Sequence, residues 1–370
     1  MKRNWLVGLC LTLLLLFVLA ACGGGEEPDT ADSDALTPVR VQLQWVAQSQ
    51  FAGYYAALAE GYYEEEGLDV TILEGAPDIV PQQVCVTGGA EFCTAWVPKV
   101  LESREAGADL VNIAQIFQRS GTVQVAFADS GIRTVEDLRG KRVGVWDFGN
   151  EHEVFAALRQ HGIDPDNPDD VTIIIQPFDM TLLLQGEIDA AEAETYNEYA
   201  MVLEQTNPAT GELYQPEELV VIDYNEVGTA MLQDAVWATD EWLNQPGNEE
   251  VAERFLRATF RGWIFCRDNF DACVEHVLNA GPTLGESHMQ WMLNEVNALI
   301  WPSPNGIGMM DGALYQQTVD ISLESGVIQN PPAADAYRTD LAERALAGIS
   351  DDTRGLGFEK IEVELRPGGE

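Results

Sequence analysis

The sequence predicts an α/β protein of two lobes, each built on a mainly parallel sheet that is flanked by helices. Strand-like and helix-like segments alternate in two successive series, which is the pattern of βαβ units. The 370 residues suffice for two domains plus a processed segment. With 46% hydrophobic residues both domains can bury sizeable cores, so an intrinsically disordered chain is excluded.

The first series of elements begins where apolar and polar residues alternate, which indicates a strand. Its first helix stops at Gly67 and its second at Gly88-Gly89, since glycine commonly terminates helices. The series comprises strands 39–46, 68–73, 91–95 and 110–117 and helices 54–65, 79–86 and 98–106.

The second series has the same alternation, and a helical region follows it from about residue 232. The series comprises strands 142–145, 171–176, 190–194 and 219–222 and helices 135–138, 151–161, 179–185 and 196–205. The helical region comprises segments 249–266, 271–278, 286–299 and 312–325.

This order predicts that the chain crosses between the lobes twice, at 121–127 and at 228–232. Lobe I is then expected to comprise 38–125 and 232–345, lobe II 126–231, and 346–370 a C-terminal tail. Ligands of open α/β sheets bind beyond the carboxyl ends of the strands, so two facing lobes are expected to share one cleft and to close on a ligand by hinge motion.

The N-terminus has the parts of a secretory signal, with Lys2 and Arg3 before an apolar run. Residues 19–22, LAAC, resemble a bacterial lipobox, whose Cys is lipidated and becomes the mature N-terminus. We therefore expect a signal peptide at 1–21, lipidation at Cys22 and a flexible tether at 22–37. The alternatives are a transmembrane anchor and an ordinary cleaved signal. The expected location is the extracytoplasmic face of a cell membrane.

The charge balance excludes one class of partner. The chain contains 20 Lys and Arg and 61 Asp and Glu, which gives a formal net charge of −41. Such a surface repels phosphate backbones, so no nucleic-acid partner is expected.

Four cysteines remain after Cys10 and Cys22, and they form two local pairs, Cys85/Cys93 and Cys266/Cys273. An even number outside the cytoplasm favours disulfides, with inert buried thiols as the alternative. Residues seven apart in one helix lie about 10 Å apart, beyond the reach of a disulfide. Each pair therefore needs a turn between its members. No C-x-x-C and no adjacent His supports a metal site or a nucleophilic Cys.

Three stretches resemble a known family. They are LQWVAQSQFAGYYAALAEGYYEEEGLDV (43–70), TGGAEFCTAW (87–96) with FQRSGT (117–122), and DLRGKRVGVWDFGNEHEVFAAL (137–158). Together they resemble the substrate-binding lipoproteins of ABC importers, in the branch similar to the thiamine-pyrimidine-synthesis proteins and next to the sulfonate and nitrate binders. The resemblance spans roughly 38–345 and implies a two-lobed periplasmic-binding type II fold. It also implies an ABC permease and its ATPase as partners.

Enzymatic members of this family consume a histidine and use pyridoxal phosphate with a cysteine-rich motif. Phe51 stands at the position that matches the histidine, and the segment between Ile222 and Trp237 holds no Cys. Nucleophile-elbow, zinc-protease and P-loop motifs are absent from the sequence. We therefore expect no enzyme, no cofactor and no metal; an extracytoplasmic enzyme on the same fold is the rival hypothesis.

Aromatic residues at or after strand ends are the first candidates for ligand binding, because stacked rings hold a flat ligand. They are Trp45, Phe51, Tyr54, Trp96 and Trp146; the alternative for each is a place in the core.

Polar candidates follow two strands of lobe II. Asn150 is expected at a helix N-cap, where free N–H groups face a carbonyl or anion, or merely as a cap. Glu194, Tyr196 and Asn197 match a family segment whose Glu faces the ligand, and a carboxylate there would repel sulfonate. The resemblance and the aromatic residues favour riboflavin as the ligand, then the thiamine precursor formylaminopyrimidine, and last a sulfonate or nitrate anion.

Overall fold

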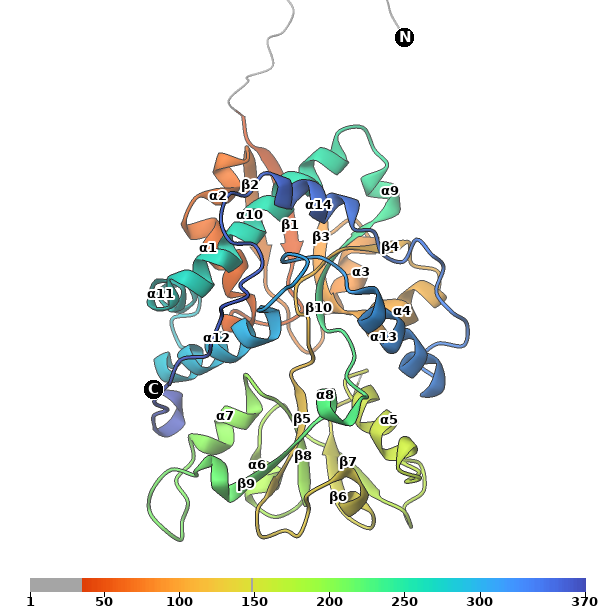
Figure 1. Ribbon diagram of the computed structural model, residues 1–370, viewed down its shortest axis with the longest axis vertical. Helices are drawn as coiled ribbons and strands as arrows, with labels where there is room; N and C mark the ends of the chain where they lie inside the picture. Colours follow the sequence, from red (N-terminus) through yellow and green to blue (C-terminus); the bar gives the residue numbers. More distant parts are fainter. Residues whose placement is uncertain (1–34, 148) are drawn as a thin grey trace, which may run out of the picture. The chain divides into compact units, whose positions relative to one another are not determined.

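The computed structural model describes residues 35–147 and 149–370. The expected signal peptide, Cys22 and all but the end of the expected tether lie outside the described residues, as does Phe148. Leu36–Glu370 forms one compact unit by itself. It contains two five-stranded sheets with flanking helices, so the α/β prediction of two lobes is confirmed (Figure 1).

The sheet of lobe I has the strand order β2-β1-β3-β10-β4. Strand β1 pairs in parallel with β2 and β3, whereas β10 runs antiparallel to β3 and β4. Four of the five strands therefore point the same way. The strands are β1 (Thr37–Gln42), β2 (Leu68–Leu73), β3 (Phe92–Trp96), β4 (Leu110–Gln115) and β10 (Asp234–Thr239).

The sheet of lobe II repeats this plan with the order β7-β6-β8-β5-β9. Strand β6 pairs in parallel with β7 and β8, and β5 runs antiparallel to β8 and β9. The strands are β5 (Thr122–Phe127), β6 (Arg142–Val145), β7 (Thr172–Ile175), β8 (Ala190–Glu194) and β9 (Leu219–Asp223).

The chain crosses from lobe I to lobe II between β4 and β5, and returns between β9 and β10. Each antiparallel strand is thus the first strand after a crossing. Strand β5 pairs from Thr122 onward within the sheet of lobe II, so the first crossing lies at 116–121 and precedes the expected boundary at 125/126.

The helices cover the faces of both sheets (Figure 1). Lobe I carries α1 (Ala52–Ala59), α2 (Tyr62–Glu65), α3 (Pro81–Val86), α4 (Val97–Glu105), α9 (Asp240–Leu243), α10 (Asn248–Asp268), α11 (Phe270–Ala280), α12 (Glu286–Ile300), α13 (Gly312–Glu324) and α14 (Asp340–Ala347). Lobe II carries α5 (His152–Gln160), α6 (Thr181–Leu184), α7 (Glu198–Leu203) and α8 (Tyr224–Val227). The 3-10 turns are η1 (Ser49–Phe51), η2 (Val135–Leu138), η3 (Pro216–Glu218) and η4 (Pro367–Gly369).

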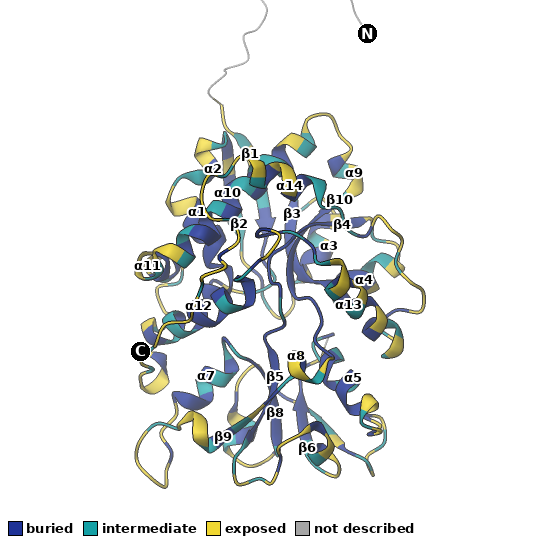
Figure 2. Ribbon diagram, viewed as in Figure 1, coloured by how far each residue is buried: buried dark blue, intermediate teal, exposed yellow. Residues whose placement is uncertain are grey.

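The largest core lies in lobe I, where α1 packs on α10. The helices approach closely because glycines stand at the contact: a Cβ at Gly53 would collide with the ring of Trp263, and a Cβ at Gly262 with the backbone of Gly53. In both lobes the strands at the centre of the sheet are largely buried, namely β3 and β10 in lobe I and β6, β8 and β5 in lobe II (Figure 2). The two sheets therefore form rigid supports for the loops at their edges.

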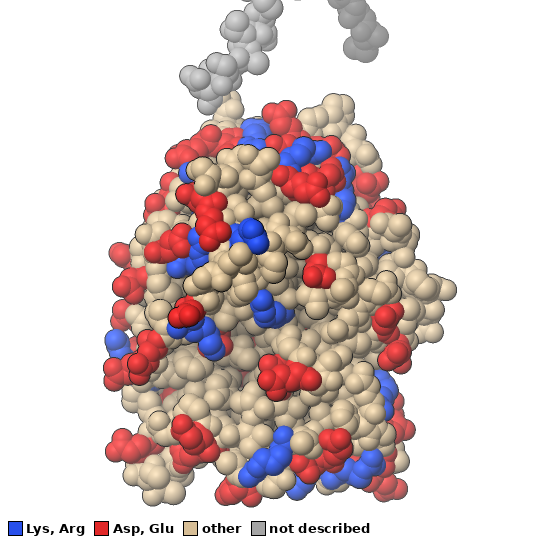
Figure 3. All heavy atoms as spheres, viewed as in Figure 1, with Lys and Arg blue, Asp and Glu red and all other residues tan. Residues whose placement is uncertain are grey.

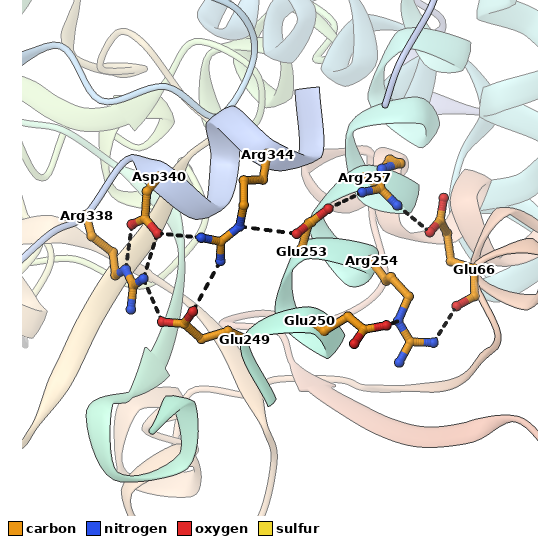
Figure 4. Close-up of polar contacts among 9 residues, drawn as sticks. All are labelled: Glu66, Glu249, Glu250, Glu253, Arg254, Arg257, Arg338, Asp340 and Arg344. Carbon is orange, nitrogen blue, oxygen red and sulfur yellow. Dashed lines mark hydrogen bonds and ion pairs between the residues drawn. The ribbon is translucent and has the colours of Figure 1, made fainter. Parts of the chain in front are cut away.

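Ion pairs join α10 to α14 on the outside of lobe I (Figure 4). Arg344 of α14 contacts Glu249 at 3.3 Å and Glu253 at 3.2 Å, and Arg338 contacts Glu249 at 2.7 Å. Arg257 links the network to Glu66 at 2.7 Å. Several charges that share partners stabilise more than isolated surface pairs, each of which contributes about 0–1 kcal/mol.

The C-terminal segment after α14 lies along α12. The N–H of Ile361 donates to Asn294 Oδ1 at 3.0 Å, and Asn294 Nδ2 donates to the carbonyl of Ile361 at 2.9 Å. Lys360 pairs with Glu295 at 2.9 Å. Turn η4 then reaches lobe II, where the N–H of Gly368 donates to the carbonyl of Glu204 at 3.1 Å.

The cysteine pairs differ from each other. Helix α10 ends before Asn269 and α11 starts after it, which brings the Cα atoms of Cys266 and Cys273 to 5.0 Å, and a disulfide joins them. Cys85 and Cys93 are free, so the second expected disulfide is wrong for this structure. Burial and the adjacent Cys85 raise the pKa of the Cys93 thiol well above its usual value, which disfavours the thiolate that disulfide formation requires.

Two surface properties bear on the environment of the chain. On the face in Figure 3, basic side chains lie beside acidic ones and form no broad basic patch. Across the part of the chain that the structure describes, none of the helices combines the length and apolarity that a membrane span requires.

Candidate functional site

A cavity of about 540 Å³ lies between the two lobes. Its walls combine aromatic rings, side-chain amides, acids and one cation. The aromatic residues are Trp45, Trp96, Trp146, Phe178 and Tyr196. The amides are Gln44, Gln48, Gln50, Gln82, Asn150 and Asn197, and a loop at 76–81 adds apolar surface. Of the nine residues expected to bind ligand, seven line this cavity: Trp45, Trp96, Trp146, Asn150, Glu194, Tyr196 and Asn197.

Three aromatic rings form one wall that crosses between the lobes. Trp45 follows β1, and its ring centroid lies 4.9 Å from that of Phe178, which follows β7. Phe178 also stacks on Trp146 at 5.7 Å with an interplanar angle of 25°. The backbone N–H of Trp146 donates to Glu192 Oε2 at 2.7 Å, and its indole Nε1 donates to the carbonyl of Pro177 at 3.3 Å, which fixes the residue at the end of β6. The faces of these rings suit a flat aromatic ligand.

Lys99 links the lobes on another side of the cavity. Its Nζ donates to Oδ1 of Asn150 at 2.7 Å and lies 4.7 Å from the ring centroid of Trp96. Desolvation lowers the pKa of Lys99 to about 8, although nearby carboxylates oppose the shift. Asn150 also donates to the carbonyl of Asp147 at 2.6 Å. The N-cap of α5 is Glu151, so the expected N-cap role of Asn150 is wrong, because the helix starts later, at His152.

Asp234, the first residue of β10, holds three lining side chains in place. Its carboxylate accepts hydrogen bonds from Gln44 at 2.6 Å, Gln50 at 3.0 Å and Trp96 Nε1 at 2.8 Å. Burial raises the pKa of Asp234 to about 7, and the three donors together with Lys99 limit the rise. Asp234 therefore positions the amides and the indole without lining the cavity.

Glu194 is the last residue of β8 and lines the cavity. Its carboxyl accepts from Thr122 Oγ1 at 3.0 Å and from Gln233 Nε2 at 3.2 Å. Burial, then Glu198 and Glu153 nearby, raise the pKa of Glu194 well above its usual range. This favours the neutral acid, which donates as well as accepts hydrogen bonds. The expected repulsion of anions by a charged Glu194 is therefore weakened.

The crossings between the lobes meet next to Glu194. Gln233, just before β10, donates to Thr122 Oγ1 at 2.8 Å and accepts from the N–H of Gly121 at 2.8 Å. A Cβ at Gly121 would stand 2.5 Å from Glu194 Oε2 and 3.0 Å from the ring of Tyr196, so a larger residue there would displace these side chains. The first crossing therefore packs directly against two residues that line the cavity.

Phe51 and Tyr54 lie in the core of lobe I, so the structure does not bring these two expected ligand-binding residues to the cavity. Phe51 is fully buried, and Tyr54 stands 6.2 Å from Trp263 of α10 in an edge-to-face contact. Their positions after a strand suggested the cleft, but packing of α1 on α10 turns both rings inward.

Four kinds of lining or supporting residue escaped the sequence prediction: the glutamines Gln44, Gln48, Gln50 and Gln82, the cation Lys99, Phe178 and Asp234. The run Q-x-x-x-Q-x-Q at 44–50 directly after a strand was the available signal for the first three. Phe178 was detectable as an aromatic residue after the strand at 171–176.

This arrangement is built for binding. Within the described residues, no group of three or more His, Cys, Asp or Glu is placed to hold a metal ion. Lys99 is the only Lys or Arg among the described residues that line the cavity. Aromatic rings and side-chain amides make up much of the lining, as is usual for sites that bind small molecules.

Two lobes with a ligand-sized cavity between them define a protein of the periplasmic-binding class. The structure resembles that of the periplasmic aliphatic sulphonate binding protein SsuA from Escherichia coli, with a TM-score of 0.60 and 18% identity, covering 90% of this chain and 97% of that one. At this identity the likeness concerns the fold. The sequence matches the NMT1/THI5 like family over residues 48–272, and the chain belongs to this family.

Two curated relatives have binding functions in their names. One is riboflavin-binding protein RibY of Chloroflexus aurantiacus, 24% identical over 344 residues, which cover 87% of this chain and 93% of the relative. The other is the formylaminopyrimidine-binding protein of Halalkalibacterium halodurans, 23% identical over 269 residues, which cover 72% and 76%.

Proposed function

We propose that this chain is the extracytoplasmic solute-binding lipoprotein of an ABC importer and that it delivers riboflavin, a neutral planar heterocycle, to a permease. Anchoring through Cys22 would hold it at the outer face of the membrane, where it would meet the permease and its ATPase. The observation that carries the ligand assignment is the aromatic wall of Trp45, Phe178 and Trp146 beside amide side chains.

The size of the cavity supports riboflavin over the thiamine precursor. A volume of about 540 Å³ is within the range of roughly 300–1,000 Å³ that is usual for small-molecule sites. A three-ring isoalloxazine with its ribityl chain uses such a space, whereas a single pyrimidine ring leaves much of it to water. The polyol and the imide edge of riboflavin also match the number of amides in the wall.

The charge of the lining disfavours a sulfonate or nitrate. Such anions need cationic groups or several N–H donors, and Lys99 already donates to Asn150. An enzyme on the same fold is the remaining rival hypothesis. The family's synthase chemistry requires a histidine that is replaced here by Phe51, a residue of the core.

The test is a titration of the unit Leu36–Glu370 with four compounds. Riboflavin is followed by quenching of flavin fluorescence, and formylaminopyrimidine, taurine and nitrate by calorimetry. We expect riboflavin to bind below about 1 µM, corresponding to about 8 kcal/mol, and the anions not to bind. Tighter binding of the pyrimidine would replace the ligand assignment, and binding of taurine or nitrate alone would overturn it. Chemical conversion of any of these compounds would favour the enzyme.

A further inference from the structure

Helix α12 of lobe I contacts lobe II through two side chains outside the crossings. Trp291 Nε1 donates to the carbonyl of Thr195 at 2.9 Å. The imidazole of His288 bridges two residues of lobe II: its Nδ1 lies 2.7 Å from Glu204 Oε1, and its Nε2 lies 2.9 Å from Asn197 Oδ1. Asn197 lines the cavity, so one ring connects the cavity wall to lobe I.

Both partners of the His288 ring are acceptors. The Asn197 amide is oriented by Glu198, whose Oε1 accepts from Asn197 Nδ2 at 2.7 Å while its Oε2 accepts from the N–H of Glu194 at 3.0 Å. The reverse orientation would set the amide oxygen of Asn197 against the Glu198 carboxylate. Asn197 Oδ1 therefore faces His288, and the Glu204 carboxylate accepts on the other side. A ring between two acceptors makes both hydrogen bonds only as the doubly protonated imidazolium.

Charged side chains of both lobes lie near His288. From α7 it faces Glu198 and Glu204, and the Glu204 side chain is 5% exposed. On its own helix the nearby charge is Glu286, which pairs with Arg366 at 3.2 Å.

The C-terminal turn η4 covers the His288–Glu204 pair. A Cβ at Gly369 would lie 2.8 Å from Cβ of His288 and 3.1 Å from Oε2 of Glu204, so the turn shields the pair from water. The remaining charge of this segment is Glu370, whose backbone carbonyl accepts from Ser287.

We propose that His288 is a positioning residue whose protonated ring fastens α12 of lobe I to α7 of lobe II and orients Asn197 toward the cavity, so that loss of its proton weakens closure of the lobes. The contact is complete when the ring is charged, at lower pH. One of its two hydrogen bonds is lost as rising pH deprotonates the ring. This inference goes beyond the proposed function, because it holds for any ligand that the closed cavity retains.

The variants are His288→Gln and the matched control His276→Gln. His276 of α11 contacts Glu60 at 2.7 Å within lobe I, so its loss removes a similar pair without touching the contact between lobes. Small-angle scattering of ligand-free Leu36–Glu370 measures closure at pH 5.5 and pH 8.5. We expect a smaller radius of gyration at pH 5.5 than at pH 8.5 for the wild type and for His276→Gln, and a clearly smaller difference for His288→Gln, in which only titrating groups such as Lys99 remain. A difference as large in His288→Gln as in the wild type, or none in the wild type, overturns the proposal.

Two further measurements separate this inference from the ligand assignment. In protein labelled with ¹⁵N-histidine, the ring of His288 should be doubly protonated at pH 5.5, with the protons on both nitrogens in hydrogen bonds. A neutral ring in the wild type at this pH would refute the proposal. The affinity for riboflavin should fall several-fold from pH 6 to pH 8 in the wild type and fall less steeply in His288→Gln, where only other groups such as Lys99 titrate. If riboflavin does not bind, the ligand assignment fails, whereas scattering and spectroscopy still test the contact.

Discussion

The ring of Trp45 in lobe I lies 4.9 Å from the ring of Phe178 in lobe II, measured between centroids. Phe178 also stacks on Trp146, so it is the central ring of a wall that both lobes build. A flat ligand that contacts this wall is held by residues from both sides of the cavity. Phe178 is 42% exposed, which leaves much of its surface available to a ligand.

Phe178→Ala is therefore expected to weaken riboflavin binding by about 10- to 100-fold, because it removes stacking and about 1.5–3 kcal/mol of apolar burial. Trp45→Ala should have an effect of at least this size. Fluorescence titration measures both. Ile175→Ala is the control: this residue of β7 is 57% exposed and does not line the cavity. Equal affinities for Phe178→Ala and the control would exclude the aromatic wall as the binding surface.

Stability should fall as the pH rises from about 4.5 to 8, because buried carboxyls titrate in this range. Burial raises the pKa of Glu153 to about 8, against hydrogen bonds from Met231 and Ser120 that favour the charged form. The folded protein thus binds a proton that the unfolded chain has released, and this stabilisation is lost as pH rises through the folded pKa. We expect Glu153 alone to contribute roughly 2–5 kcal/mol to this loss.

Glu153→Gln should therefore flatten the dependence of the unfolding free energy on pH, since an amide imitates the neutral acid. Urea denaturation at several values between pH 5 and pH 8 measures the slope. Glu217→Gln at the exposed turn η3 should leave the slope as in the wild type. A steeper slope in Glu153→Gln than in the wild type would contradict the assignment.

The strands that sequence analysis missed are β5 and β10, and both have the same physical character. They read TVQVAF and DAVWAT and are buried on both faces, and polar and apolar residues alternate only over the first four residues of β5. Each runs antiparallel between two strands of the lobe that the chain has just entered. The βαβ rhythm predicts only the parallel strands, so the segments 122–127 and 234–239 read as connections. Pairing with strands distant in sequence decides their structure.

Contacts between segments distant in sequence also limit what can be predicted of the candidate site. Trp45, Trp96 and Trp146 end or follow strands that the alternation predicted, and they line the cavity. Phe51 and Tyr54 also follow a strand, but the orientation of their helix depends on α10, which begins about 200 residues later. Asp234 escaped notice because its role arises only when β10 pairs with β3 and brings it to Gln44, Gln50 and Trp96. Local patterns locate strand ends; tertiary contacts select which side chains face the cavity.

The thiol content gives a direct test of the cysteine assignment. Leu36–Glu370 contains four cysteines, of which Cys266 and Cys273 are joined and Cys85 and Cys93 are free. Thiol titration of the denatured, unreduced protein should therefore find two sulfhydryls. Four sulfhydryls would show that Cys266 and Cys273 are not joined. No sulfhydryls would show that Cys85 and Cys93 form a second disulfide. Replacing Cys266 and Cys273 by Ala should cost about 2–3 kcal/mol, because the closed loop is short.

Processing at Cys22 would place the protein on a membrane, and Cys22→Ser should release it. One acyl chain anchors only marginally, so we expect more than one chain on the mature N-terminus. Fractionation of cells by sedimentation compares the two proteins, with Cys85→Ala as the control for loss of a thiol. Sedimentation of Cys22→Ser with the membranes would rule out this lipid anchor.

The hydrogen bond from Lys99 to Asn150 should stabilise the closed state, because its two residues come from opposite lobes. Lys99→Met keeps most of the side-chain volume and removes the donor, and Asn150→Ala removes the acceptor. A charge-assisted bond in a half-buried place contributes about 1–2 kcal/mol, so each variant should bind riboflavin about 5- to 30-fold more weakly. Scattering with saturating ligand should show less compaction in both variants.

The double variant should bind riboflavin no more weakly than the weaker of the two single variants, since both changes remove the same bond. The pKa of about 8 for Lys99 adds a condition: the wild-type advantage should shrink above pH 8, where the amine loses its charge. Lys360→Met, which breaks a pair with Glu295 within lobe I, serves as the control. Fully additive losses in the double variant would show that Lys99 and Asn150 act separately and that their bond does not hold the lobes together.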